Sequence, residues 1–179
     1  MYRKLKICEL NRLSTEEFKV TPKIPLVLVL DNIRSQHNIG AAFRTADAFT
    51  LEKILLCGIC ATPPSPEIHK SALGAEESVT WSYINDCKKA IQILKGQGYI
   101  IISVEQTENS TMLNDFVPVC GNRYALVFGN EVKGIQQEVV DISDAVVEIP
   151  QFGTKHSLNV SVSIGIVVWK IVSAGISTI

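Results

Sequence analysis

Three short segments of the chain carry polar side chains whose types suit chemistry, and each follows an apolar run that is typical of a strand. The first segment, RSQHNIGAAFRTA, contains Asn38 and Arg44. A guanidinium is a planar fork of N–H donors that suits a phosphate group. Arg44 could equally be a surface residue paired with Asp47, and Asn38 is expected to cap a helix. Taken alone, this segment favours an ordinary surface ion pair, with a phosphate contact as the alternative.

The second segment, VFGNEVKGI, places Asn130 and Glu131 between Gly129 and Gly134. A phosphate-binding loop would have Lys and then Ser or Thr after its second glycine, whereas Ile and Gln follow here. The chain contains no GxGxxG either. The segment therefore predicts a glycine-flanked loop that presents an amide and a carboxylate after a buried strand. A plain turn between a strand and a helix is the alternative.

The third segment, FGTKHSLNVSVS, puts small polar residues in front of a strongly apolar helix. Gly153 is expected to end a loop, Ser157 to cap the helix, and Asn159 to lie in its first turn. A simple cap and close helix packing would explain these residues one by one. They would not explain why all three segments fall at one edge of the predicted sheet.

The elements that must position these segments alternate between strands and helices. Strands are expected at 26–33, 53–60, 78–84, 99–105, 123–130 and 145–150. Helices are expected at 38–49, 86–98 and 135–143, and again from about residue 158, while the Pro-rich stretch 61–76 is expected to be a loop leading into a short helix. This alternation favours an α/β fold with a mostly parallel sheet and helices on both faces. Ligands of such folds bind beyond the carboxyl ends of the strands.

Length and charge set outer bounds on the protein. The chain has 179 residues, of which 46% are hydrophobic and 20% charged, which fits one domain with a sizeable core. The net charge of -1 neither supports nor excludes a nucleic-acid partner. Residues 1–25 hold six basic against three acidic side chains. We therefore expect a basic N-terminal extension at 1–25, with a short helix capped by Ser14 and Glu17, ahead of a main domain at 26–179.

The cysteines and the apolar C-terminal segment argue against a metal centre and a membrane span. Cys57 and Cys60 form a single CxxC inside an apolar run, whereas a zinc site needs about four ligands. We expect reduced, buried thiols. Segment 158–179 is long enough to span a bilayer, but Lys170 would cost about 2.5–3.5 kcal/mol near its centre. A buried or interface helix is expected instead, in a cytoplasmic protein because no apolar run follows the basic start at 1–6.

NIGAAFRTA, FGNEVKG and IPQFGTKHSLNVSVS resemble, in order and spacing, the three motifs of the TrmH-like (SpoU) branch of the SPOUT methyltransferases. The resemblance runs from about Leu26 to Ala174. It implies transfer of a methyl group from S-adenosylmethionine to a ribose 2′-hydroxyl in tRNA or rRNA, with no metal. It also implies a deep trefoil knot near the C-terminus and a homodimer whose active site is completed across the subunit interface.

The resemblance also assigns roles to residues. It implies five catalytic residues, Arg44, Glu131, Ser157, Asn159 and Asn38, and cofactor contacts at Val104, Gly129, Asn130, Ile149, Gly153 and Leu158. Because a guanidinium is a poor base, we expect Arg44 to hold the adjacent phosphate and to stabilise the developing alkoxide. Glu131 would order the second loop, Asn38 would shape the loop around Arg44, and Ser157 and Asn159 would set the third loop and the target ribose.

RNA contacts are expected at Lys155 and His156 in the third segment and at Lys70, with ordinary solvated charge as the alternative. Two other function classes stay open at this point. The chain could be a non-catalytic module that binds cofactor and RNA, or a partner subunit of another methyltransferase. A methyltransferase for a small molecule is a further alternative, and it would lack salt-sensitive RNA binding.

Overall fold

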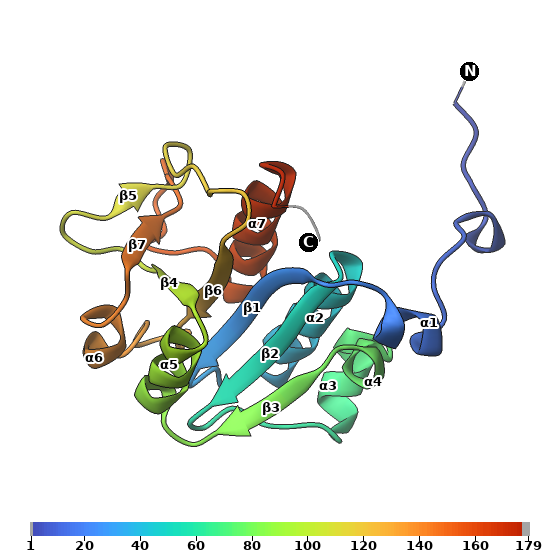
Figure 1. The fold of residues 1–179 in the computed structure, drawn as a ribbon, viewed down its shortest axis with the longest axis horizontal. Helices are drawn as coiled ribbons and strands as arrows, with labels where there is room; N and C mark the ends of the chain where they lie inside the picture. The colour runs from blue at the N-terminus through green and yellow to red at the C-terminus, as the bar shows by residue number, and fades with distance from the viewer. Residues whose placement is uncertain (1, 177–179) are drawn as a thin grey trace.

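The computed structural model describes residues 2–176 and is built on a seven-stranded sheet in the order β3-β2-β1-β6-β4-β7-β5 (Figure 1). The strands span Ile24–Asp31 (β1), Leu51–Cys57 (β2), Trp81–Ile84 (β3), Tyr99–Val104 (β4), Thr111–Met112 (β5), Arg123–Phe128 (β6) and Ala145–Glu148 (β7). Each pairing between these strands is parallel. The predicted α/β fold with a mostly parallel sheet is therefore confirmed.

Helices cover both faces of the sheet. They span Thr15–Val20 (α1), Gln36–Ala48 (α2), Pro66–Ala72 (α3), Ala75–Ser78 (α4), Cys87–Gly96 (α5), Gln137–Val140 (α6) and Val160–Ser173 (α7), with a short 3-10 helix at Ile7–Glu9 (η1). Alternate residues of β1 point to opposite faces. Leu28 packs in the core that includes α2, α3 and α7, and Val29 packs in the core that includes α5 and α6. The predicted two-sided arrangement is thus confirmed.

Three elements differ from the sequence-based expectation. Helix α6 is a single turn at Gln137–Val140, and the backbone N–H groups of Ile135 and Gln136, just before it, donate to the carboxylates of Glu105 and Asp31. Strand β3 begins only at Trp81, since the preceding residues form α4. Strand β5 was missed because two exposed residues leave no periodic pattern.

The N-terminal segment before α1 runs away from the body of the molecule (Figure 1). The predicted capping box is present, because the Ser14 side chain accepts from the backbone of Glu17 and the Glu17 side chain accepts from the backbone of Ser14. Asp86 caps α5, because its side chain accepts from the backbone of Lys89. Both helix starts therefore carry a local capping signal in the sequence.

The apolar C-terminal segment forms α7, a helix of 14 residues that buries Ile164, Val167, Val168 and Ile171. Its one cation, Lys170, donates to the carbonyl oxygen of Asn114 at 3.1 Å. Within residues 2–176 no helix combines the length and the apolar character that crossing a membrane requires. The predicted buried helix is confirmed, and the last three residues of the predicted segment lie outside the described residues.

Both cysteines of the CxxC are buried, as predicted. Burial raises the pKa of the Cys60 thiol to about 12, although hydrogen bonds from the backbone of Cys57 and Ile33 act in the opposite direction. Because the thiolate is the form that binds metal or attacks a disulfide, a protonated Cys60 is a core residue.

Helices α2 and α3 meet so closely at Gly40 that a side chain does not fit. A Cβ built there would lie 2.0 Å from Ser71 Oγ and 2.5 Å from the Ile68 carbonyl oxygen. Both neighbours belong to α3, and one of them is backbone, which cannot swing aside. Gly40 therefore allows α2, which carries Arg44, to pack closely against α3.

We predict that Gly40→Ala lowers the free energy of unfolding by about 1–3 kcal/mol, as expected for overpacking of a tight contact. The matched control is Gly96→Ala at the end of α5, where an added Cβ meets nothing within 4 Å. That variant should stay within about 1 kcal/mol of the wild type. Urea unfolding of both proteins checks the difference, and equal stability of the two variants would contradict the packing argument.

Candidate functional site

The three polar segments meet at the carboxyl edge of the sheet, and the Glu131 carboxylate joins the second to the first. One oxygen accepts from the backbone N–H of Arg34 at 3.0 Å. The other accepts from the backbone N–H of Ser35 at 3.0 Å and from Asn38 Nδ2 at 2.9 Å. A single side chain therefore fixes the segment that leads into α2.

Two asparagines complete the connection. Asn130 Nδ2 donates to the carbonyl oxygen of Asn32 at 2.7 Å, which links the second segment to the residues just before the first. Asn159 Nδ2 donates to Asn38 Oδ1 at 3.3 Å, which ties the third segment to the first. The predicted convergence of the three segments is thus present as a hydrogen-bonded network.

The second segment is a tight loop that closes on itself. Asn130 and Gly134 exchange two backbone hydrogen bonds, and Asn130 Oδ1 accepts from the backbone of Val132 and Lys133. A Cβ at Gly129 would lie 2.2 Å from the carbonyl carbon of Gly134. Glycine at 129 is therefore required by the close approach of backbone to backbone.

Two predicted helix caps are wrong. Helix α2 is capped by Ser35, whose side chain accepts from the backbone of Asn38, so Asn38 lies one turn inside the helix. Helix α7 is capped by Asn159 and not by Ser157, which precedes the helix. Asn38 cannot serve as a cap because its amide is shared between Glu131 and Asn159.

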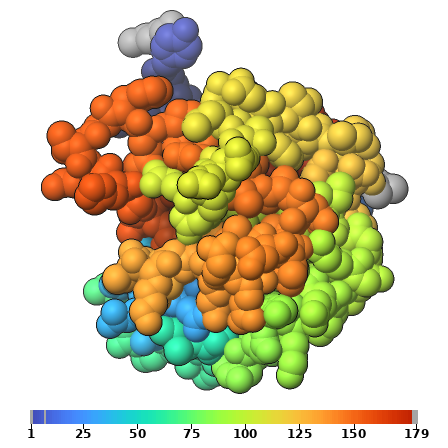
Figure 2. Space-filling view, turned by 90° about the vertical axis from the view of Figure 1, so that its left-hand side faces the viewer, coloured from blue at the N-terminus to red at the C-terminus, as the bar shows by residue number. Residues whose placement is uncertain are grey.

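A cavity of about 690 Å³ opens beside this network, where strands β4, β6 and β7 end. The third segment forms one of its walls and stands out from the left of the molecule in Figure 2. The lining includes five predicted cofactor contacts and four other predicted site residues: Val104, Gly129, Asn130, Ile149, Leu158, Glu131, His156, Ser157 and Asn159. The sequence therefore identified nine of the residues that line the cavity.

Five predicted residues do not line the cavity. Asn38 lies behind Glu131, and Gly153, Lys155 and Lys70 are exposed elsewhere, Lys70 on α3. Arg44 lies on the exposed side of α2, and its side chain has no hydrogen bond or ion pair with any of residues 2–176. Its suggested pairing with Asp47 is absent, since Asp47 accepts from Ser78 Oγ at 2.7 Å instead.

Sequence reasoning missed two carboxylates that hold the second segment from below. Glu105 Oε2 accepts from the backbone N–H of Ile135 at 2.9 Å. Asp31 is fully buried and accepts from both the backbone and the side-chain amide of Gln136 at 2.9 Å. Each follows or ends a buried strand, so the rule that located Glu131 would have found them too.

Hydrogen bonding keeps Glu131 charged. Burial acts to raise its pKa, but the N–H groups of Arg34, Asn38 and Ser35 outweigh burial and hold the pKa below the ordinary value of 4.5. A carboxylate that accepts several N–H bonds is favoured in its ionised form. The network is therefore intact at neutral pH.

This geometry defines a class: an α/β protein with a cavity of small-molecule size at the carboxyl edge of a parallel sheet. Residues 25–169 match the SpoU rRNA Methylase family, and the chain belongs to this family. It is 34% identical over 143 residues to the 23S rRNA (guanosine-2'-O-)-methyltransferase RlmB of Neisseria meningitidis, an alignment that covers 80% of this chain and 56% of that protein. The family inferred from the three motifs is thus confirmed.

Solved structures have the same fold. The A. aeolicus TrmH/SpoU tRNA modifying enzyme aligns with a TM-score of 0.76 at 24% identity, over 87% of this chain and 78% of that one. An AdoMet-bound rRNA methyltransferase from Sinorhizobium meliloti aligns with a TM-score of 0.76 at 25% identity, over 81% of this chain and 54% of that one. The chain spans little more than half the length of the relative from Neisseria and of the enzyme from Sinorhizobium.

We predict that Glu131→Gln lowers the free energy of unfolding at pH 7 by about 1–1.5 kcal/mol, a modest cost because Glu131 is exposed and water screens its charge. The glutamine amide would turn an N–H toward donors that now meet an oxygen. Because the pKa of Glu131 is lowered in the folded state, its stabilisation is present above the ordinary pKa and is lost as pH falls through the lowered one. Urea unfolding should therefore show the largest difference at neutral pH, and the two proteins should converge as pH falls below the lowered pKa of Glu131.

The control for this pH series is Glu138→Gln. Glu138 forms an exposed ion pair with Lys88 at 3.3 Å and has 54% of its side chain exposed. Its replacement should cost less than about 1 kcal/mol. If the difference in the free energy of unfolding between Glu131→Gln and the wild type did not change with pH, the charge of the carboxylate would not be what holds the segments.

Proposed function

We propose that this protein is an S-adenosylmethionine-dependent RNA methyltransferase that methylates a ribose 2′-hydroxyl in tRNA or rRNA. The observation that carries the proposal is the network of Glu131, Asn38 and Asn159 beside the cavity, because it joins all three family motifs. Membership of the SpoU rRNA Methylase family supports the reaction. The relative from Neisseria, named for 2'-O-methylation of guanosine in 23S rRNA, supports RNA as the substrate.

The cavity fits the cofactor. Its volume of about 690 Å³ lies within the usual range for small-molecule sites, which is roughly 300–1,000 Å³. Val104, Ile149 and Leu158 offer apolar contacts for an adenine, and Gly129 and Asn130 offer backbone groups at the edge of the same space. Gly153 does not line the cavity, and we propose that it affects cofactor binding through the backbone path of the third segment. When bound, S-adenosylmethionine supplies the methyl group that is transferred.

The protein's own residues would position the RNA. Ser157 and Asn159 lie in the cavity wall and are available to orient the target ribose. Glu131 and Asn38 act as positioning residues, since both hold the loops and neither needs to touch the reacting atoms. Most of the rate enhancement would come from orientation and exclusion of water, and no metal takes part.

Arg44 would hold the phosphate next to the target nucleotide and stabilise the alkoxide that develops at the 2′-oxygen. Its exposed position outside the cavity supports a site that a second copy completes. Val162, Ile166 and Trp169 form an exposed apolar stripe on α7, and the Trp169 ring lies 6.0 Å from that of Phe49 just after α2. We propose that this stripe is the homodimer contact.

Two further features of the proposal rest on the family. The likeness in fold to solved TrmH/SpoU structures supports a deep trefoil knot that includes the third segment. Residues 1–25 would be a basic extension to a methyltransferase domain at 26–179. With Lys155, His156 and Lys70 it would contact RNA phosphates, which give affinity with little sequence choice.

A non-catalytic cofactor and RNA module, or a partner subunit of another methyltransferase, is the second candidate. The one observation in its favour is that Arg44 does not line the cavity of the single chain. Methyl transfer by the purified protein decides between the two candidates.

We predict that the protein transfers labelled methyl groups from S-adenosylmethionine to tRNA or rRNA from cells that lack it. Arg44→Ala should lower this transfer by about 10²-fold or more and leave cofactor affinity within a few-fold, because Arg44 lies outside the cavity. Scintillation counting and calorimetry measure the two quantities.

Arg44→Lys is the matched variant, since it keeps the charge and removes the planar fork. It should retain part of the transfer. Equal losses of transfer and cofactor affinity in Arg44→Ala would contradict the assigned role. Bound cofactor without transfer to either RNA pool would favour the non-catalytic candidate.

We also predict a dimer at micromolar concentration that Trp169→Glu converts to a monomer, because a charge would be buried in the apolar contact. Sedimentation equilibrium measures this. Val119→Glu, which also replaces an exposed apolar residue but lies before β6, should remain dimeric. A wild-type monomer would contradict the shared site.

A further inference from the structure

A second cavity lies at the turn between α3 and α4 and shares no lining residue with the first. It has a volume of about 470 Å³ and is lined by Pro63, Pro64, Ser65, Pro66, His69, Glu76, Glu77 and Trp81. Neither the three motifs nor the proposed reaction uses these residues. The cavity therefore requires a separate explanation.

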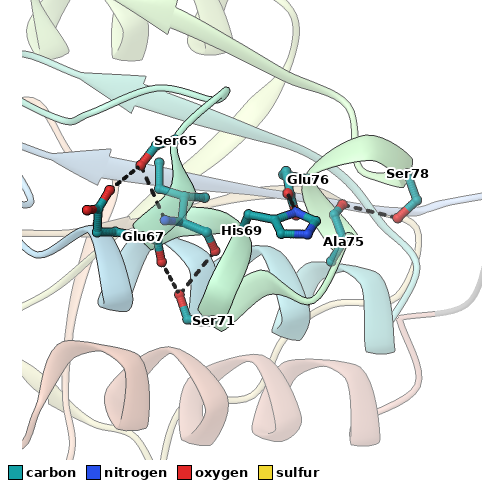
Figure 3. Close-up of polar contacts among 8 residues, drawn as sticks. Ser65, Glu67, His69, Ser71, Ala75, Glu76 and Ser78 are labelled. Atoms are coloured by element: carbon teal, nitrogen blue, oxygen red, sulfur yellow. Dashed lines mark hydrogen bonds and ion pairs between the residues drawn. The ribbon is translucent and has the colours of Figure 1, made fainter.

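Three side chains of this cavity bring metal-ligating atoms together. A ring nitrogen of His69 and carboxylate oxygens of Glu76 and Glu77 all lie within 4.8 Å of one another. His69 Nδ1 is 2.5 Å from Glu76 Oε1, and Figure 3 shows the ring turned toward that carboxylate. His69 lies on α3, and Glu76 and Glu77 lie on α4. The turn between these two helices therefore brings the three side chains together.

The carboxylate of Glu76 provides the independent observation. Only 9% of its side chain is exposed. Its second oxygen, Oε2, is buried and has no hydrogen-bond partner among the described residues. A buried carboxylate oxygen without a partner is costly, and a cation held by the same carboxylate would stabilise its charge.

The charge of the lining has the sign that a cation needs. Two carboxylates face the cavity, and the described lining includes no lysine or arginine. Lys70, although adjacent in sequence to His69, is not part of the wall. The attraction is strengthened by the low exposure of Glu76, because buried charges are screened less by salt.

We propose that His69, Glu76 and Glu77 form a binding site for one divalent zinc-like cation. One imidazole nitrogen and two carboxylate oxygens suit Zn²⁺, whereas Mg²⁺ favours an octahedron of oxygens. With Zn–N and Zn–O distances of about 2.0–2.2 Å, Nδ1 of His69 and Oε1 of Glu76 must move apart by just under about 1 Å from their present distance. Both atoms lie on side chains, so small changes in side-chain torsion angles allow this. The fourth position faces the cavity and takes water.

Such a cation would act on stability. It would connect α3 to α4, and α3 packs against α2 at Gly40. The site is separate from the first cavity, so cofactor affinity should not depend on it. Zinc should therefore raise the melting temperature of the full chain without changing cofactor binding.

Calorimetric titration of the full chain with Zn²⁺ tests the proposal directly. The titration uses a Cys8→Ser, Cys120→Ser background, because these two cysteines are exposed and their thiols bind zinc on their own. We expect one Zn²⁺ per chain. His69→Asn and Glu76→Gln should each weaken binding by about tenfold or more.

Glu67→Gln is the matched control. The substitution is the same change from a carboxylate to an amide as in Glu76→Gln. Glu67 lies on α3, as His69 does, but its carboxylate accepts from Ser65 Oγ at 3.2 Å and is outside the cluster (Figure 3). It should bind zinc like the background protein. Zinc should raise the melting temperature of the control and of the background protein, EDTA should reverse the rise, and Mg²⁺ at the same concentration should have no effect.

Absence of zinc binding in the background protein overturns the proposal, and so does equal affinity in the control and the cluster variants. If Glu76→Gln fails to fold, Glu77→Gln replaces it, because Glu77 is exposed and its loss should weaken zinc binding without unfolding the chain. The outcome is independent of the methyltransferase assay.

Discussion

The carboxylate of Glu131 accepts hydrogen bonds from two backbone amides and one side-chain amide at the entrance to α2. Loops at the end of a sheet have few apolar contacts to hold them. Here a charged acceptor that receives several hydrogen bonds holds them instead. Asp31 and Glu105 do the same beneath the second segment. Three carboxylates therefore give irregular backbone a fixed shape, and the cavity follows from that shape.

The rest of the molecule supports this edge. The central strands are buried on both faces, and their carboxyl ends are fixed because the strands cannot shift register without moving every side chain. Gly40 brings α3 against α2 from behind. The side of α2 that remains is open, and it carries Arg44 together with the start of the apolar surface around Phe49 and Trp169. The open side is where a second copy would fit.

The sequence predicted β1, β2, β4 and β6 well because each is a mostly apolar run, and it missed β5, whose two residues are exposed. Through the motifs it also identified nine of the residues that line the cavity. It gave the wrong caps for α2 and α7, since Asn38 and Asn159 are bonded to partners 93 and 121 positions away, which no local signal reports. The contact between His69 and Glu76 could not be predicted from the sequence either. It depends on a turn in which Leu73 and Gly74 both have positive φ, and only Gly74 invites that conformation.

The order of the strands has a consequence for how the site comes into being. Strands β1 and β6 are neighbours in the sheet, yet the residues joined at their ends, Arg34 and Glu131, are 97 positions apart. Parallel pairing across such a separation closes a long loop, which makes it intrinsically slow to form. The binding edge needs both strands and the loops that follow them to be in place. Any molecule that binds there recognises only the finished domain, and its binding free energy is added to the stability of the whole domain instead of to one loop.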